Sequence, residues 1–403
     1  MRVLIASNEL HPIAGGAVGT LYIGRKFSER GHEVTLTGPL HSEKSKAERE
    51  LGFKVIPFNL PFQVSKSVPI RGPRYLAYAF SFIPHFLKLA PFFDFILMRN
   101  CLVGFSGSFA SIIRRPGCMA LSLSDLLAGF LAEDPYYPKF LSDILLLAEK
   151  QIPKCFPLVF VVSPLMKREL TRAGVPAQAI EVTFDGVDVN RFDPHIQPAR
   201  VFDRPTVISF GSLDWHHGAH LLIDIVKEVQ KRQDVQFMIV GGGPAYPYLA
   251  RKLKGRPYVL MTNFVPYESI PSYIASSDLG IIPYPKNYSL DLVLTLKLLE
   301  TLSMARPVVC SNLASVKEVF GGYEFVKIGE DVKTFADRIL EIVNLPRSER
   351  KRMGLRGRKL VTDKFSWDVV TTAMVTKCEK LFLESNRTGS PKRLDAQTLQ
   401  VSR

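Results

Sequence analysis

Lys297 and Glu300 are the residues whose types and spacing first suggest chemistry with a charged ligand. They lie three positions apart in the segment 294–311, which reads LTLKLLETLSMARPVVCS, so both side chains leave the same face of a helix. The N–H groups at the amino end of a helix suit phosphate, and a carboxylate one turn later can accept two hydrogen bonds from a sugar diol. The alternative is a surface ion pair on an ordinary helix that ends near Pro307.

The elements around this pair alternate between short β-branched strands and helical patterns, which indicates parallel sheets with helices on both faces. A first series runs from residue 2 and a second starts near residue 205, after an irregular segment rich in Asp, Pro and Arg. We expect a Gly-containing loop at Gly15 and Gly16 after the first strand, and a final amphipathic helix. The strands are expected at 2–7, 32–38, 53–58, 93–100, 118–125, 158–163, 206–212, 235–244, 258–265, 279–284, 306–311 and 323–329.

The sequence therefore predicts two Rossmann-like, doubly wound parallel-sheet α/β domains that face each other across a cleft. The expected boundaries are 1–195 for the first domain, 196–365 for the second, 366–385 for a helix that crosses back to the first domain, and 386–403 for a disordered tail. In such sheets ligands bind beyond the carboxyl ends of the strands. The glycine loop, the three glycines 241–243 and the segment before Glu300 all follow strands, so we expect them on one side.

Composition limits the class of partner. The chain has 403 residues, 46% of them hydrophobic and 22% charged, and a net charge of +14. This charge favours an acidic partner such as anionic lipid, nucleotide phosphate or nucleic acid. Nucleic acid is disfavoured because the chain has no zinc-ligand spacing and no aromatic-basic RNA-binding pattern. Five cysteines without CxxC spacing, and an amino end too briefly apolar for a signal peptide, predict reduced thiols and a cytoplasmic protein.

Other chemistries fit the sequence less well. The segment GGGPAY at 241 lacks the third glycine of a dinucleotide fingerprint, and GTLYIGRK at 19–26 misses the lysine position of a P-loop. His216, His217 and His220 have no carboxylate or cysteine partner at zinc-like spacing, so no metal site is expected. A serine hydrolase elbow of the form GxSxG is also missing from the sequence.

Four segments, in collinear order, resemble the two-domain GT-B glycosyltransferases, and most closely the retaining enzymes of glycosyltransferase family 4. The likeness covers residues 1 to about 385. The four segments are the opening strand, glycine loop and helix (1–38), VVSPLMKRELTRAGVPAQAIEVTFDGVDVNRFDP, FVPYESIPSYIASSDLGIIPY and KLLETLSMARPVVCSN.

The resemblance implies roles for individual residues. Glu300 would hold the ribose hydroxyls of a UDP- or GDP-sugar donor, and the segment from Thr295 through Leu296 to Lys297 would lie near the diphosphate. The backbone of Val265 would meet the base. The residues expected to take part in catalysis are His217, Lys297, Glu300 and Ser124. The residues expected to bind the donor are Gly15, Gly16, Ser212, Gly242, Val265, Thr295, Leu296, Lys297 and Glu300.

The chain departs from the family pattern at three places. Ser212 and His217 replace an Arg and a Lys that contact the diphosphate, and Ser124 replaces a His that positions the acceptor. An acidic residue eight positions before Glu300 is also replaced, because Leu292 stands there with Asp291 beside it. A variant family pattern, Ser-Pro-x-Lys-Leu-x-Glu, also lacks this acid. Losing a charge-assisted phosphate contact costs roughly 1.5–3 kcal/mol if nothing replaces it.

Two functions from different classes follow. The first is a retaining glycosyltransferase that uses a nucleotide-sugar donor, with no permanent cofactor and no metal ion. The second is a GT-like nucleotide-binding subunit that has lost turnover, and a GT-B sugar-nucleotide epimerase is a third alternative. The apolar stretch 75–98, with Lys66, Arg71 and Arg74 before it, permits a helix lying on the inner face of a membrane or a helix packed against a sheet. A lipid-linked or membrane-surface acceptor is the corresponding hypothesis.

Overall fold

The chain divides into two compact units in its computed structural model. The structure describes residues 1–8, 10, 15–40, 44–59, 73–113, 118–126, 128–129 and 138–387. Unit 1 consists of Met1–Phe184 and the residues from Val370 onward, and unit 2 consists of Asp185–Val369. Unit 2 thus begins at Asp185, before the domain boundary that was expected at residue 195. Most of the tail expected at 386–403 lies outside the described residues.

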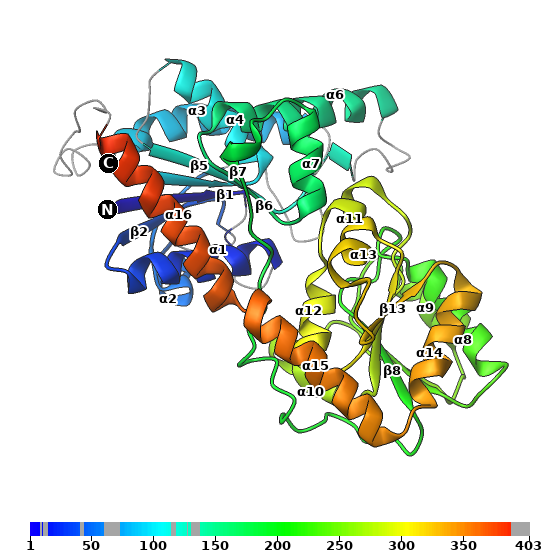
Figure 1. Ribbon diagram of the computed structural model, residues 1–403. Coiled ribbons are helices and arrows are strands. Elements are labelled where there is room, and N and C mark those ends of the chain that lie inside the picture. The colour runs from blue at the N-terminus through cyan, green and yellow to red at the C-terminus, as the bar shows by residue number, and fades with distance from the viewer. Residues whose placement is uncertain are drawn as a thin grey trace. The chain divides into compact units, whose positions relative to one another are not determined.

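Unit 1 contains a seven-stranded parallel sheet with the order β3-β2-β1-β4-β5-β6-β7 (Figure 1). Strand β1 pairs with β2 on one side and with β4 on the other, so that Leu4 lies beside both Thr35 and Ile96. The sequence predicted six of these strands and missed β7, a three-residue edge strand. The strands are β1 (Arg2–Ser7), β2 (Glu33–Gly38), β3 (Lys54–Pro57), β4 (Phe95–Arg99), β5 (Cys118–Leu123), β6 (Val159–Val161) and β7 (Ile180–Val182).

Helices cover both faces of this sheet. One core joins β1, β2 and β4 to α1 and to Met374, Val375 and Cys378 of α16, and α3 and α4 pack together over the other face (Figure 1). Helix α7 begins at Pro164 and is capped by Ser163, whose Oγ accepts a hydrogen bond from the N–H of Met166 at 3.0 Å. The helices are α1 (Gly15–Glu29), α2 (Lys44–Leu51), α3 (Pro73–Leu89), α4 (Cys101–Ile113), α6 (Lys139–Gln151), α7 (Pro164–Arg172) and α16 (Trp367–Arg387), with 3-10 turns η1 (Ala90–Phe92), η2 (Ile152–Cys155) and η3 (Ala177–Ala179).

The stretch 75–98 packs against the sheet, and the surface-helix alternative is wrong for its main aromatic face. Tyr78, Phe82 and Phe86 of α3 are fully buried, and the ring of Phe58 meets the rings of Tyr78 and Phe82 edge-on. The stretch then turns through η1 into β4 instead of continuing as one helix. Lys66 and Arg71 lie outside the described residues. In the part of the chain that the structure describes, no helix is both long and apolar enough to cross a membrane.

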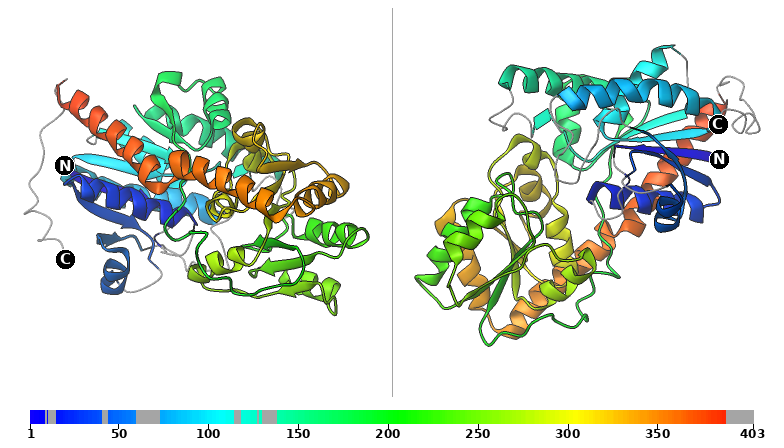
Figure 2. Two further views of the ribbon diagram at one scale, coloured as in Figure 1. Left: turned by 60° about the horizontal axis from the view of Figure 1, so that its bottom comes forward. Right: turned by 180° about the vertical axis from the view of Figure 1, so that it is seen from behind.

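Unit 2 contains a six-stranded parallel sheet with the order β10-β9-β8-β11-β12-β13. Its core on one face joins α8, α9 and α14 to the central strands, while α10, α12 and α15 belong to the other face (Figure 2). The strands are β8 (Thr206–Phe210), β9 (Gln236–Val240), β10 (Val259–Met261), β11 (Leu279–Ile282), β12 (Val308–Ser311) and β13 (Val326–Gly329). The helices are α8 (Ala219–Gln230), α9 (Tyr246–Leu253), α10 (Ile270–Ala275), α11 (Tyr288–Leu292), α12 (Leu296–Ser303), α13 (Ala314–Phe320), α14 (Val332–Val343) and α15 (Arg347–Phe365), with the 3-10 turn η4 (Tyr267–Ser269).

All five cysteines are free, in agreement with the expectation of reduced thiols. Cys101, Cys118, Cys310 and Cys378 are buried, whereas Cys155 is exposed. Burial raises the pKa of the Cys310 thiol to about 12, so this sulfur stays protonated at neutral pH.

Candidate functional site

The strand order of unit 2 reverses at β8, which lies between β9 and β11. In doubly wound sheets the crevice for a ligand opens at such a point, beyond the carboxyl ends of the strands. Gly211 follows β8, Gly241 follows β9, and Tyr284 lies just beyond β11. The residues that gather at this edge define the candidate site.

Glu300 is a buried carboxylic acid on α12 and not half of a surface ion pair. Its side chain is 6% exposed, and Oε1 accepts a hydrogen bond of 2.6 Å from the hydroxyl of Tyr267. Burial raises its pKa from 4.5 to about 7, although the Tyr267 hydrogen bond and the charges of Lys297 and Arg191 oppose this rise. The guanidinium of Arg191 stacks on the Tyr267 ring at 5.2 Å from its centroid. A carboxylate has about four lone-pair sites, so Glu300 can accept further hydroxyl groups beside Tyr267.

Lys297 reaches from α12 to the end of β8. A Cβ atom placed on Gly211, whose φ is +104°, would lie only 2.4 Å from Lys297 Cε and 2.9 Å from Nζ. The position therefore requires glycine, both for its backbone conformation and for this contact. Lys297 Nζ also lies 5.2 Å from the centroid of the Tyr284 ring, a cation–π contact that holds the ammonium at the edge of the sheet.

The amino end of α12 adds donors at the same place. Thr295 is the residue before the first turn and has extended backbone angles, and its side chain makes no capping hydrogen bond to the helix. Its Oγ1 lies 3.4 Å from the hydroxyl of Tyr284. The N–H of Leu298 donates to the Thr295 carbonyl at 3.1 Å, whereas the N–H groups of Leu296 and Lys297 stand at the amino end of the helix and can donate to an anion. Thr295, Leu296, Lys297 and Glu300 are thus brought together as the sequence predicted.

Ser212 and His217, which replace the family's Arg and Lys, meet at one carboxylate. Asp214 Oδ2 accepts hydrogen bonds from Ser212 Oγ at 2.9 Å and from His217 Nδ1 at 2.7 Å, and Oδ1 accepts the backbone N–H of His217 at 2.8 Å. Burial raises the pKa of Asp214, but the hydrogen bonds from His217 and Ser212 outweigh it, and the pKa falls to about 2. Asp214 is therefore an ionised acceptor at neutral pH.

This arrangement fixes what His217 can do. Because Nδ1 donates to Asp214, Nε2 can donate to a further acceptor only when the ring is protonated. The His217 ring lies 4.9 Å from the Tyr284 ring, centroid to centroid, so it shares this aromatic neighbour with Lys297. Sequence reasoning missed Asp214, although it stands three positions before His217 and could have been paired with it.

The loop after β9 lies close against the neighbouring loops. A Cβ on Gly241, whose φ is +132°, would come within 2.1 Å of the Gly211 carbonyl oxygen, and one on Gly242 within 2.4 Å of Asn263 Oδ1. Gly242 is therefore confirmed at this edge of the sheet. Val265 follows β10 in the next loop and is partly buried.

The remaining predicted residues belong to unit 1. Gly15 and Gly16 are the first two residues of α1, so the expectation that they form a loop is wrong; a helix amino end still presents N–H groups there. Ser124 Oγ accepts a hydrogen bond from Nη2 of the buried Arg99 at 3.4 Å. Asn100, with a φ of +70°, donates from Nδ2 to Asn8 Oδ1 at 2.8 Å. The carboxyl edge of this sheet thus holds a polar cluster of its own.

Two positions near the site have structural roles. Asp291 Oδ1 accepts the N–H of Ala314 at 2.9 Å and so caps α13, and Leu292 is buried. Among the described residues, no three His, Cys, Asp or Glu side chains come close enough together to hold a metal ion.

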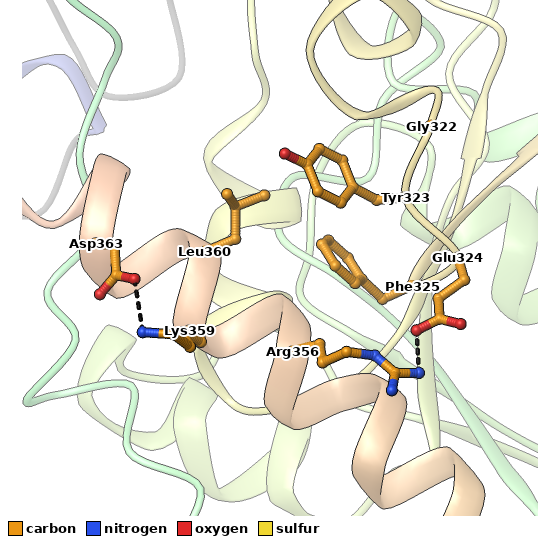
Figure 3. A pocket seen from close by; sticks show the side chains of 8 residues that line it. All are labelled: Gly322, Tyr323, Glu324, Phe325, Arg356, Lys359, Leu360 and Asp363. Carbon is orange, nitrogen blue, oxygen red and sulfur yellow. Dashed lines mark hydrogen bonds and ion pairs between the residues drawn. The ribbon is translucent and has the colours of Figure 1, made fainter.

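A cavity of about 410 Å³ in unit 2 lies away from this site (Figure 3). It is bordered by Tyr323 and Phe325, whose rings stack 5.0 Å apart, and by α15. Phe325 immediately precedes β13, so the cavity lies at the amino ends of the strands. Its volume does not make it the ligand site, because the convergent polar groups lie at the opposite edge of the sheet.

Comparison with known protein families identifies both halves of the chain. Residues 14–186 match the family described as Glycosyl transferase 4-like domain, and residues 204–344 match the family described as Glycosyl transferases group 1. A GDP-mannose-dependent alpha-(1-6)-phosphatidylinositol monomannoside mannosyltransferase of Mycobacterium tuberculosis is 24% identical over 397 residues, which covers 93% of this chain and 97% of that relative. Alpha-D-kanosaminyltransferase of Streptomyces kanamyceticus is 34% identical over 123 residues, or 29% of this chain and 30% of that protein.

Solved structures agree with this fold. Sucrose-phosphate synthase from Thermosynechococcus elongatus superposes with a TM-score of 0.74 at 16% identity and covers 95% of this chain and 99% of its own. Anabaena HepE in complex with UDP and glucose superposes with a TM-score of 0.73 at 17% identity, over 94% of this chain and 99% of its own. Both likenesses concern the fold alone.

Proposed function

Because this chain belongs to the group 1 glycosyltransferases of GT-B fold, we propose that it transfers a sugar, with retention at the anomeric carbon, from a GDP-sugar to a lipid-linked acceptor. The observation that carries the proposal is the cluster of Glu300, Lys297 and the α12 amino end at the switch point of unit 2. Within one helical turn, this cluster offers a carboxylate that can accept hydrogen bonds from a ribose diol, a fixed cation, and N–H donors. A nucleoside diphosphate sugar needs all three.

The choice of donor rests on a relative and is open to test. The mycobacterial relative is named as GDP-mannose-dependent, whereas HepE was solved with UDP. We therefore propose a GDP-hexose, with a UDP-hexose as the alternative outcome of the assay.

The choice of acceptor rests on the same relative and on charge. That relative is named for a phosphatidylinositol monomannoside. The residues of unit 1 include 27 Lys and Arg against 17 Asp and Glu, so this unit carries most of the net charge of +14. A positive surface attracts anionic lipid headgroups, which supports a cytoplasmic enzyme working at the inner face of a membrane.

The proposed reaction breaks the bond between the anomeric carbon and the diphosphate oxygen, and the electron pair leaves with the diphosphate. Lys297 Nζ, the N–H groups at the amino end of α12 and His217 would meet this developing charge. The acceptor hydroxyl attacks on the face that the diphosphate leaves, and its proton passes to the departing phosphate oxygen. Ser124, with Arg99 behind it, is the candidate for positioning the acceptor in unit 1.

A nucleotide-binding subunit without turnover remains the second candidate, because Asp214 places an anion where the family has two cations. Incubation with GDP-mannose, UDP-glucose and other nucleotide sugars, with and without mannosylated phosphatidylinositol, separates the two. Transfer or slow donor hydrolysis supports the enzyme. Binding of GDP or UDP without turnover of any donor supports the subunit.

Replacing Asp214 with asparagine is expected to weaken GDP binding about tenfold, because the carboxylate that accepts hydrogen bonds from His217 Nδ1 and Ser212 Oγ is lost and neither side chain is then held in place. Calorimetric titration of wild type, Asp214→Asn and Asp224→Asn with GDP measures this. Asp224→Asn serves as the control, since Asp224 is exposed on α8 and lies outside the candidate site. Tighter GDP binding by Asp214→Asn would show that Asp214 only repels the phosphate.

Replacing Tyr267 with phenylalanine is expected to weaken nucleotide binding near pH 7 by roughly tenfold and much less near pH 9. The variant loses a hydrogen bond that favours the charged form of Glu300, so the pKa of Glu300 rises further and less carboxylate is present at neutral pH. GDP titrations from pH 6 to pH 9 test this, with Tyr323→Phe as a control far from the site. A loss that is equal at every pH would contradict the role given to the hydroxyl.

A further inference from the structure

The cavity at the amino ends of the unit 2 strands joins two aromatic rings to two ion pairs (Figure 3). Its volume of about 410 Å³ falls within the range of about 300–1,000 Å³ that is typical of pockets for small molecules. Phe325 is 3% exposed, whereas Tyr323, whose ring stacks on it, is 38% exposed. Leu360 of α15 adds an aliphatic side chain to the lining. The cavity thus presents an accessible aromatic ring to a ligand.

The Tyr323 ring is held in place by its neighbours. It stacks on Phe325 with ring centroids 5.0 Å apart and planes at 27°, and it meets the ring of Phe320 at 6.4 Å and 60°. The Tyr323 N–H donates to the Phe320 carbonyl at 2.9 Å. A Cβ on Gly357 would lie 3.2 Å from Phe325 Cδ2, so this glycine lets α15 pack closely against Phe325. A ligand therefore meets a ring whose position is already fixed, which lowers the entropic cost of binding.

Two ion pairs border the same cavity. Arg356 pairs with Glu324, and Lys359 Nζ lies 3.0 Å from Asp363 Oδ2. Ion pairs on an exposed helix are common and contribute little to stability. These two pairs differ from such decoration because they share one cavity with the Tyr323 ring (Figure 3).

The charges of this lining balance. The cavity is bordered by two cations and two carboxylates, so the carboxylates would repel a phosphate group that the cations attract. The cations only donate hydrogen bonds, and the carboxylates only accept them. A hydroxyl group both donates and accepts, so a polyol can bond to both members of each pair without separating them. The lining therefore suits an uncharged polyol better than an anion.

We propose that this cavity is a second binding site, which takes a neutral pyranose unit of a glycan. The C–H groups of a sugar ring carry partial positive charge, because each carbon bears an electronegative oxygen, and the face of the Tyr323 ring attracts them. The sugar hydroxyls bond to the two ion pairs. The site goes beyond the proposed function, because it lies at the amino ends of the strands and the donor site lies at their carboxyl ends. It holds a glycan and takes no part in bond breaking.

Gly322 offers a way to block the cavity without disturbing its rings. It lines the cavity, its φ lies outside the left-handed region, and a Cβ placed on it would meet no atom within 4 Å. Leucine can therefore be introduced at this position without strain, and its side chain occupies space that the sugar needs.

The test is a titration of the isotope-labelled, full-length protein with methyl α-mannopyranoside and with methyl α-glucopyranoside. The amide NMR signal of Glu324 reports on the cavity itself and not on sugar that binds elsewhere. We expect a dissociation constant of roughly 1 mM for at least one of the two sugars. Tyr323→Ala should bind that sugar about tenfold more weakly, and Gly322→Leu should also bind it more weakly. Phe140→Ala is the matched control, since Phe140 is 67% exposed on α6 of unit 1, and its affinity should be unchanged.

A variant with altered charge tests the class of ligand. Glu324→Gln combined with Asp363→Asn leaves both cations without a carboxylate partner. This variant is expected to bind the 6-phosphate of the preferred sugar about tenfold more tightly than the wild type does. The wild type is expected to bind the uncharged glycoside more tightly than the sugar phosphate. The opposite order in the wild type, or no gain in phosphate binding by the variant, would overturn the choice of a neutral sugar.

The remaining outcomes decide whether the cavity is a site at all. If neither glycoside shifts the Glu324 signal, or if the folded Tyr323→Ala and Gly322→Leu variants bind as tightly as the wild type, the inference is overturned. Should Tyr323→Ala fail to fold, weaker binding by Gly322→Leu supports the inference, and unchanged binding overturns it. The titration uses no nucleotide donor and no turnover, so its failure leaves the proposed function standing, and a failure of sugar transfer leaves this inference standing.

Discussion

Lys297→Met is expected to lower kcat/KM for sugar transfer roughly a hundredfold, with a smaller effect on GDP affinity. Methionine keeps the unbranched apolar stem of the side chain beside Gly211, up to the position of Cε, but removes the ammonium. A fixed donor that meets charge developing on a leaving group is worth about 10²–10³ in rate. The loss should fall mainly on kcat, because the leaving diphosphate carries more charge in the transition state than in the bound donor.

Steady-state kinetics of Lys297→Met with the best donor, beside Lys317→Met, checks this expectation. Lys317 is an exposed lysine on α13 and lies outside the candidate site. An unchanged kcat/KM in Lys297→Met would show that the ammonium does not act on the diphosphate. A raised KM with an unchanged kcat would mean that Lys297 binds the donor in the ground state and does not act on the transition state.

Glu300→Gln is expected to weaken GDP binding ten- to a hundredfold while making the ligand-free protein more stable at pH 8. Glutamine still accepts the Tyr267 hydroxyl, but it lacks the charge that strengthens hydrogen bonds to a ribose diol. Stability should rise because the wild type must ionise a carboxyl group that is 6% exposed. A residue that costs stability where it binds ligand is common at functional sites.

The sign of the pH effect follows from the pKa of Glu300, which burial raises from 4.5 to about 7. Between these values the folded state holds the proton more tightly than the unfolded state does, so the free energy of unfolding of the wild type falls as pH rises. The side chain of glutamine does not ionise, so it makes no contribution of this kind. The free energy of unfolding of the variant should therefore exceed that of the wild type by at most about 3 kcal/mol at pH 8. At pH 5 the difference between the two should be small.

Denaturant unfolding of wild type, Glu300→Gln and the exposed control Glu268→Gln at pH 5 and pH 8 measures this difference. Equal stability of Glu300→Gln and wild type at both pH values would mean that Glu300 is not desolvated in the ligand-free protein.

Much of the fold could be predicted from the sequence because parallel sheets have a strong signature. Runs such as RVLIAS and TVISF are apolar on both faces, and each is followed by a helical pattern, so both sheets could be predicted directly. The edge strand β7 was missed because three residues of pairing leave no periodic pattern. Gly15 and Gly16 were read as a loop because glycine disfavours helix interiors; at the first turn of α1 this penalty matters less.

The site was only partly predictable because its partners meet through tertiary structure. Lys297 and Glu300 share one helical turn, so their spacing alone indicates a common face. The hydrogen bond from Tyr267 to Glu300 joins residues that are 33 positions apart in the sequence, so no local pattern predicts it. Asp214 and His217 come within hydrogen-bonding distance only because the chain turns tightly after β8. Their spacing of three residues does not by itself predict this contact.

A crystal structure of the protein with bound GDP tests the central claim most directly. The account predicts ribose hydroxyls within hydrogen-bonding distance of Glu300, and diphosphate oxygens within that distance of Lys297 Nζ and the first N–H groups of α12. GDP bound in the cavity beside Tyr323, or bound anywhere with Glu300 contacting Tyr267 alone, would contradict it.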